Sequence, residues 1–198
     1  MDRWVEALSP GVVRRVLEGA EAQPRWLPRW VLSVISADVD TTAGVGAVWL
    51  MWLPKTGRAY EHTVLLEWYD ERWRYLGGGS SGPVDDEPVD VDVMEIVGES
   101  GSISLTRRPA SPDLTVPGPW VGSVEVHLAP DVGHLLVDNR RIDVPEQRRL
   151  IAAWRTPHAG PRPRPLIVAF GRDGTELTRI GPGDTLDTHT WAQLEEES

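Results

Sequence analysis

Apolar and polar residues alternate most regularly between residues 59 and 76. In the first part of this stretch, Ala59 to Tyr69, one parity is mainly apolar or aromatic and the other carries Glu61, Thr63 and Glu67, which is typical of a β-strand with one buried face. The members of the apolar row are Tyr60, His62, Val64, Leu66 and Trp68. Arg72 to Leu76 reads as the next strand, after a tight turn at Asp70 and Glu71.

This turn predicts the pairing of the two strands. It would place Trp68 opposite Trp73, Leu66 opposite Tyr75, and Glu67 opposite Arg74. Aromatic and oppositely charged neighbours both stabilise antiparallel pairs, so each pairing is favourable.

Two further strands are predicted upstream, at Arg29 to Ala37 and Val45 to Leu53. If Pro54 to Gly57 is a four-residue loop, Trp49 lies opposite His62, and Met51 opposite Tyr60. The same sheet face would then carry one aromatic row over three strands: Trp49, Met51, Tyr60, His62, Leu66, Trp68, Trp73 and Tyr75. The other parity of the second strand, Val48, Leu50 and Trp52, is also apolar, so a second layer must cover it. The C-terminal half or another copy of the chain could supply that layer.

One helix is predicted before the strands, over about residues 10 to 22. Ser9 reads as its N-cap, Pro10 as its first helical residue, and the valines and leucine that follow repeat at helical spacing. Residues 1–79 are therefore predicted to form a helix on a four-stranded antiparallel meander.

A change of composition follows this meander. Residues 80–90 are rich in glycine, proline and acidic residues, which predicts a linker. Residues 91–183 contain short strand candidates with turn signals, including the ambiguous segment Leu150 to Trp154, and predict a small antiparallel β-sandwich. Asp173-Gly174 predicts a type I′ turn that pairs Phe170 with Leu177. Residues 184–198, which end in acidic residues, are predicted to be a frayed tail. The predicted fold class is therefore mainly β, with an α+β N-terminal part.

Charge and composition narrow the function classes. The net charge of −10 divides evenly between the two halves, so no basic half is available to bind nucleic acid. The chain has no cysteine, and its longest apolar run is far shorter than the ~20 residues of a membrane span. We therefore expect a soluble cytoplasmic protein that binds neither nucleic acid nor a membrane.

Two resemblances to known families follow from these patterns. Residues 121–180 contain a VEV strand, a V-D-N-R hairpin, an AAW strand and a final D-G hairpin, and they resemble a β-sandwich module that recurs in actinobacterial proteins. The first aspartate of that last hairpin is Gly171 here. This resemblance implies an immunoglobulin-like fold and no activity. Residues 1–79, which end in WYDERWRYLGG, are similar to NTF2-like (cystatin-like) domains, where such a hairpin closes a conical pocket.

The sequence offers little catalytic chemistry. Ser80 lies in a G-x-S-x-G pattern, but no helix is predicted after it, so we interpret it as part of the linker. His62 could act as a general base if burial lowered its pKa, yet no carboxylate shares its predicted face, and a packed histidine bonded to a backbone carbonyl is the preferred interpretation. The other histidines have no metal-binding spacing, and the acidic residues between 85 and 92 lack the pattern of an EF-hand. No catalytic residue, metal or cofactor is predicted.

Two functional hypotheses follow. The first is a non-enzymatic interaction or accessory protein that uses aromatic sheet faces to bind a protein partner or a second copy. The alternative is a small-ligand-binding or enzymatic pocket in the N-terminal part. The candidate ligand-binding residues are Trp49, His62, Trp68, Trp73 and Tyr75.

Overall fold

The chain is mainly β, with an N-terminal helix and antiparallel sheets, as the alternation predicted. The computed structural model describes residues 3–53, 58–84, 91–106, 119–156 and 164–196. The chain forms two compact units. Unit 1 contains residues 1–87, 99–124 and 151–162, and unit 2 contains residues 88–98, 125–150 and 163–198.

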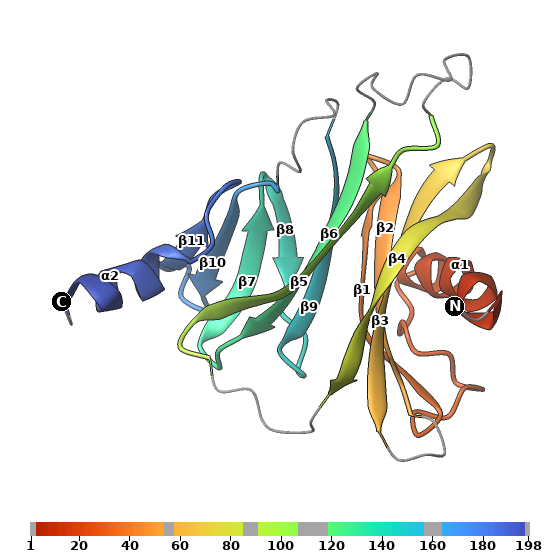
Figure 1. Cartoon of the computed structure of the whole chain (residues 1–198), viewed down its shortest axis with the longest axis horizontal. Coiled ribbons are helices and arrows are strands. Elements are labelled where there is room, and N and C mark those ends of the chain that lie inside the picture. The colour runs from red at the N-terminus through yellow and green to blue at the C-terminus, as the bar shows by residue number, and fades with distance from the viewer. Residues whose placement is uncertain (1–2, 54–57, 85–90, 107–118, 157–163, 197–198) are drawn as a thin grey trace. The chain divides into compact units, whose positions relative to one another are not determined.

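Unit 1 contains the predicted meander, which the structure confirms. Its strands are β1 (Leu32–Asp40), β2 (Val45–Trp52), β3 (Ala59–Tyr69) and β4 (Arg72–Val84). They form a four-stranded antiparallel sheet in the order β1-β2-β3-β4 (Figure 1). The first of these strands begins and ends three residues later than predicted, and the loop predicted at residues 54–57 lies outside the described residues.

The β3–β4 hairpin has the predicted pairing at its turn. Trp68 pairs with Trp73, Leu66 with Tyr75, and Glu67 with Arg74. The two turn residues, Asp70 and Glu71, have φ angles of 53° and 60°. Both are therefore left-handed, as a type I′ hairpin turn requires.

The predicted pairing between β2 and β3 is wrong by one residue. Trp49 pairs with Thr63, Leu50 with His62, and Trp52 with Tyr60. Because side chains alternate along a strand, a shift of one residue moves a whole set of side chains to the other face. Trp49 and Met51 therefore leave the predicted aromatic row, and Val48, Leu50 and Trp52 take their place.

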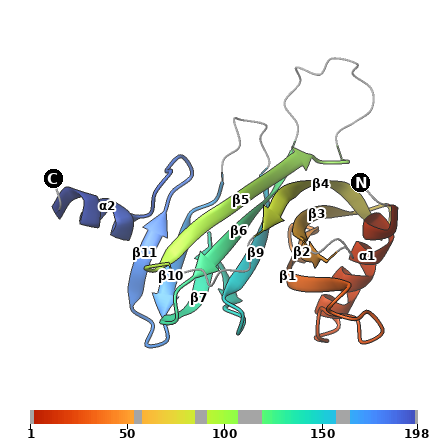
Figure 2. The same ribbon diagram turned by 60° about the horizontal axis from the view of Figure 1, so that its bottom comes forward.

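Helix α1 (Arg3–Leu17) begins earlier than predicted and contains Pro10 in its interior. It ends where Gly19 adopts a φ of 69°, and the amides of Glu18 and Gly19 bond to the carbonyls of Arg14 and Val16 at 3.0 Å each. Such a left-handed glycine commonly ends a helix, so α1 ends before residue 22, the predicted last residue. Helix α1 lies against one face of the sheet (Figure 2). Its Val12 and Val13 are fully buried there, in a cluster with Leu32, Val34, Val48, Leu50, Val64 and Leu66.

The opposite face of the sheet is covered by strands β6 (Trp120–Leu128) and β9 (Arg149–Thr156). Val121, Ile151 and Ala153 from these strands share a buried cluster with Trp49, Leu65 and other residues of the four-stranded sheet. Later parts of the same chain thus supply the second cover that the doubly apolar strand β2 required. The strand interpretation of Leu150 to Trp154 is confirmed.

The segment predicted as a linker differs from the structure in its first part. Residues 80–84 belong to β4, which continues through the glycine run, whereas residues 85–90 lie outside the described residues. The next strand, β5 (Met94–Ile103), joins parts of two strands that were predicted separately, and it forms a three-stranded sheet with β6 and β9. Both compact units draw on several stretches of chain, unlike the predicted domains 1–79 and 91–183.

Unit 2 contains a second four-stranded sheet, in the order β11-β10-β7-β8. Its strands are β7 (Val132–Val137), β8 (Arg140–Asp143), β10 (Ile167–Gly171) and β11 (Glu176–Ile180). Phe170 pairs with Glu176 rather than with the predicted Leu177, because the loop is one residue longer, with Gly174 alone left-handed at 85°. The predicted frayed tail is also wrong, since Thr188–Glu196 forms helix α2.

Candidate functional site

Four of the five candidate ligand-binding residues lie on the α1 face of the sheet, and three of them, Trp68, Trp73 and Tyr75, lie together at its hairpin end. The rings of Trp68 and Trp73 meet edge to face, with centroids 5.6 Å apart and planes at 66°. Trp68 is 50% exposed, whereas Trp73 and Tyr75 pack against the cluster beneath α1. The hairpin end of the sheet therefore presents one exposed indole supported by a half-buried one.

Tyr75 lies where the sheet meets α1. Burial raises the pKa of its phenol, and the negative charge of Glu6 raises it further. Tyr75 therefore keeps its proton at neutral pH and can contribute a hydroxyl group, but no charge, to this surface.

Trp49 does not belong to this group, which corrects the prediction. It lies on the opposite face, is fully buried, and donates a hydrogen bond from Nε1 to Oε2 of Glu61 at 3.0 Å. The indole fills the core between the sheet and strands β6 and β9. No ligand can reach it without unfolding that core.

His62 lies next to Ser80, a partner that the sequence did not suggest. The two residues pair across β3 and β4, and Ser80 Oγ lies 2.8 Å from His62 Nδ1. Ser80 occupies an exposed position in a strand, whereas a nucleophile elbow holds its serine at a sharp turn between a strand and a helix. The contact therefore binds two strands together and lacks the backbone setting of that catalytic motif.

Buried carboxylates occur in unit 1, and each has a structural partner. Glu67 is fully buried and accepts hydrogen bonds from Ser104 Oγ at 2.5 Å and from the Leu105 amide at 2.6 Å, while Arg155 Nη1 lies 3.4 Å away. Glu67 thus bonds across the layers instead of to Arg74, which pairs with Asp70 at 3.1 Å. Asp38 accepts a hydrogen bond from the Ala153 amide at 2.8 Å and so provides an acceptor for one backbone N–H of β9.

The most exposed aromatic residues are two that the sequence analysis did not select. Trp26 and Trp30 are 74% and 73% exposed on the loop between α1 and β1. The signal in the sequence was a repeat, Pro24-Arg25-Trp26 followed by Pro28-Arg29-Trp30.

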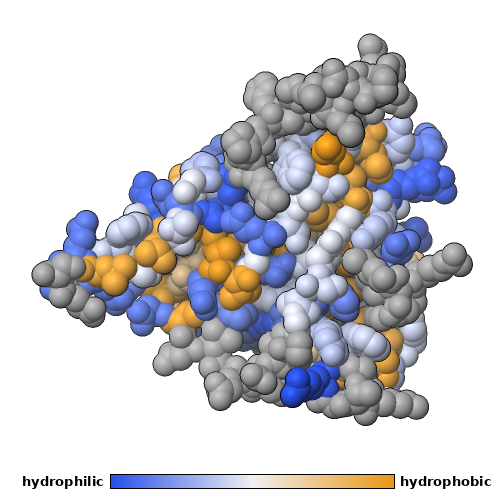
Figure 3. All heavy atoms as spheres, in the orientation of Figure 1, coloured by the Kyte–Doolittle hydropathy of each residue, from blue (hydrophilic) through white to orange (hydrophobic). Residues whose placement is uncertain are grey.

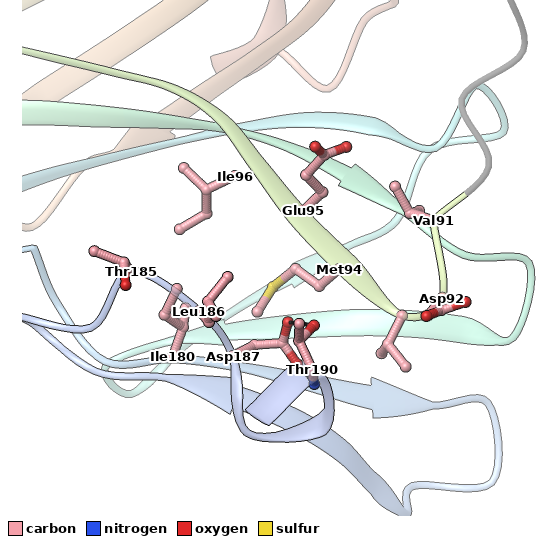
Figure 4. Close-up of a pocket in the computed structure, with 11 residues that line it drawn as sticks. Val91, Asp92, Met94, Glu95, Ile96, Ile180, Thr185, Leu186, Asp187 and Thr190 are labelled. Carbon is pink, nitrogen blue, oxygen red and sulfur yellow. Dashed lines mark hydrogen bonds between the residues drawn. The ribbon is translucent and has the colours of Figure 1, made fainter. Parts of the chain in front are cut away.

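Unit 2 has a groove of about 360 Å³ between β5 and the segment that leads into α2. Figure 4 shows Met94 pointing from β5 toward Leu186 and Asp187, whereas the carboxylate of Glu95 points away. Ile96 and Ile180 add apolar lining to the groove. Around α2, small groups of apolar residues lie among hydrophilic ones on the surface (Figure 3).

The one buried carboxylate of this groove is already engaged. Asp187 accepts bonds from the Thr178 hydroxyl, from the His189 and Thr190 amides at 2.9 and 3.3 Å, and from Thr190 Oγ1 at 2.8 Å. Burial alone would raise the pKa of Asp187, but these hydrogen bonds outweigh burial and lower the pKa. Asp187 is therefore the N-cap of α2 and a structural residue.

Within the described ranges, no group of three or more histidine, aspartate or glutamate residues is placed to hold a metal ion. No helix in the same part of the chain is long and apolar enough to cross a bilayer. Comparisons of this chain with protein-family models, curated proteins and solved structures find no match. Its function must therefore be argued from the geometry described above.

Proposed function

We propose that this chain is a non-enzymatic interaction or accessory protein, which binds a protein partner or a second copy through the aromatic face at the β3–β4 hairpin. The observation that carries the proposal is the exposure of Trp68, at 50%, on the sheet face that also carries Trp73 and Tyr75. Each face of the sheet has a buried cluster that does not include Trp68, so this side chain is not needed to fill a core.

The physical support comes from the chemistry of interfaces. Tryptophan and tyrosine are enriched among the residues that dominate binding energy, because a large ring loses little conformational freedom when it is buried. Trp73 holds the ring of Trp68 from the side, so the exposed indole is partly pre-oriented. A cytoplasmic location fits this proposal, since the chain has no cysteine.

The test compares two tryptophans of equal exposure. Trp68 and Trp191 are both 50% exposed, so Trp191→Ala on α2 is a matched control for Trp68→Ala. We expect light scattering or affinity capture from the native lysate to show a complex that Trp191→Ala keeps and Trp68→Ala loses. A strict monomer that captures no partner through Trp68 would overturn the proposal.

The alternative, a small-ligand or enzymatic pocket of NTF2-like type, has less support. Trp73 and Tyr75 pack against the cluster that includes Val13, and Trp49 is buried on the other face. The groove in unit 2 is lined by other residues. Quenching or a shift of tryptophan fluorescence by a metabolite, absent in Trp68→Ala, would favour this alternative. The immunoglobulin-like relation of residues 121–180 likewise stays a proposal.

A further inference from the structure

The loop between α1 and β1 carries an unusual surface. Its repeated Pro-Arg-Trp sequence places Trp26 and Trp30 at 74% and 73% exposure, with Arg25 and Arg29 also exposed. We call residues 24–30 the Trp–Arg loop. Single exposed apolar residues are common on proteins, but two nearly bare indoles four residues apart are not.

Hydrogen bonds and apolar packing hold the backbone of the Trp–Arg loop in place. Gln23 is 6% exposed; its Nε2 donates to the carbonyls of Leu27 and Leu32 at 2.8 and 3.2 Å, and its Oε1 accepts from the Val34 amide at 2.7 Å. Leu27 packs against the cluster beneath α1. The backbone of the loop is therefore fixed while both indoles are exposed to solvent. Binding would require little further ordering of this backbone.

The same loop concentrates positive charge in an acidic protein. Its two arginines lie in a chain of net charge −10. Arg29 pairs with Glu21 at 2.6 Å, but both side chains are more than half exposed, at 65% and 60%. Such a surface pair contributes little stability, so the guanidinium group can exchange this carboxylate for one from a partner.

Charge and aromatic character together define the occupant. Arginine binds carboxylates in a forked geometry, and exposed indoles bind apolar or aromatic side chains. An anionic membrane is the weaker fit, because electrostatic membrane binding uses clusters of about four to eight basic residues. The loop has two arginines, and the rest of the chain is acidic.

We propose that the Trp–Arg loop docks an acidic segment of another protein, in which carboxylate side chains alternate with apolar ones. This surface contains none of the candidate residues of the β3–β4 hairpin. The inference therefore stands or falls separately from the proposed function.

The first experiment is a selection. A displayed library of random peptides is selected against the full chain and counter-selected against Trp26→Ala/Trp30→Ala. Enrichment of peptides that combine aspartate or glutamate with apolar residues is the expected result. No enrichment, or enrichment of neutral or basic peptides, would overturn the proposal.

The second experiment measures the affinity of an enriched peptide by fluorescence anisotropy. We expect Trp26→Ala/Trp30→Ala and Arg25→Gln/Arg29→Gln each to weaken binding about tenfold or more. Added salt should also weaken binding, since charge contributes to it. The matched controls, Trp191→Ala and Arg172→Gln, alter exposed residues of unit 2 and should bind like the wild type. Circular dichroism and Tm confirm that the variants fold.

Two further measurements separate the other occupants. Cosedimentation with phosphatidylserine vesicles that depends on Trp26 and Trp30 would assign the loop to a membrane. A concentration-dependent dimer in light scattering that Trp26→Ala/Trp30→Ala abolishes would assign it to a second copy. Either result would replace the acidic protein segment as the occupant, whereas no vesicle binding and a monomer insensitive to these substitutions would support it.

Discussion

Trp49 and Trp68 show that one residue type has two roles within one sheet. Trp49 is fully buried and hydrogen-bonded to Glu61, whereas Trp68 is half exposed and supported from the side by Trp73. The side chain of Trp49 is therefore part of the core, and that of Trp68 is available to a partner. Their different environments lead to different consequences of substitution.

We predict that Trp49→Phe lowers the free energy of unfolding by about 2 to 4 kcal/mol. Phenylalanine lacks the indole N–H, so the buried carboxylate of Glu61 loses a hydrogen bond, and the smaller ring leaves a cavity. The control Trp68→Phe, at a half-exposed position, should change stability by less than about 1 kcal/mol. Urea unfolding followed by circular dichroism measures both, and equal losses in the two variants would contradict the assignment of Trp49 to the core.

The sequence predicted the sheet face of Trp68 correctly and that of Trp49 wrongly. The turn at Asp70 and Glu71 fixed the β3–β4 register, so Trp68, Trp73 and Tyr75 were grouped correctly. No comparable turn signal fixed β2 against β3, and because both parities of β2 are apolar, a shift of one residue looked equally favourable. The exposed Trp26 was missed because its loop has no periodic pattern.

At the level of elements, β4 shows that a glycine-rich stretch can be a strand. The strand predicted from residue 72 ends at Leu76, before the run Gly77 to Gly79, yet each residue of this run pairs with β3. A Cβ atom on Gly78 would lie 2.1 Å from the Thr63 carbonyl oxygen. Glycine is needed here because the two backbones approach too closely for any side chain.

We therefore expect Gly78→Ala to destabilise unit 1 by about 2 kcal/mol or more, through the clash with β3. Gly82→Ala in the same strand is the control, because its added Cβ meets no atom within 4 Å. That substitution should be neutral or slightly stabilising, by up to about 1 kcal/mol. If thermal unfolding shows the same small effect for both, β4 does not extend through the glycine run.

Helix α2 depends on its N-cap in a manner that pH can test. Hydrogen bonds lower the pKa of Asp187 in the folded state, despite burial, so its carboxylate stabilises the fold at and above the ordinary aspartate pKa of about 3.9. As the pH falls through the lowered pKa, the carboxylate is protonated and this contribution is lost.

In Asp187→Asn this pH dependence should disappear. At neutral pH we expect the variant to be less stable than the wild type by about 0.5 to 2 kcal/mol, and the difference should shrink as the pH falls below about 4. Urea titrations over this pH range measure the free energy of unfolding of both proteins. The difference between them removes the pH dependence of the other carboxylates, which both proteins share. A difference that stays constant with pH would mean that the charge of Asp187 does not stabilise α2.

For the whole molecule, the sequence predicted the number of layers better than it predicted the path of the chain. The doubly apolar β2 correctly indicated a sheet covered on both sides, because an exposed apolar face of that size is unfavourable in water. Composition could not show that residues 120–124 and 151–156 return to provide the second cover. Such long-range pairing leaves no local pattern in the sequence.

One face of the meander is buried only when the later strands β6 and β9 are present. A fragment of residues 1–87 has the helix and all four strands of the meander, but it lacks Val121, Ile151 and Ala153. Ile35, Ala47, Trp49 and Leu65 would then face water, and so the fragment should bind a hydrophobic dye, associate, and show tryptophan emission shifted to longer wavelength. A fragment of residues 1–162, which contains every stretch of unit 1, should restore the emission of the full chain. If the fragment alone is monomeric and unfolds cooperatively, residues 1–79 fold without the later strands, as the predicted domain boundaries imply.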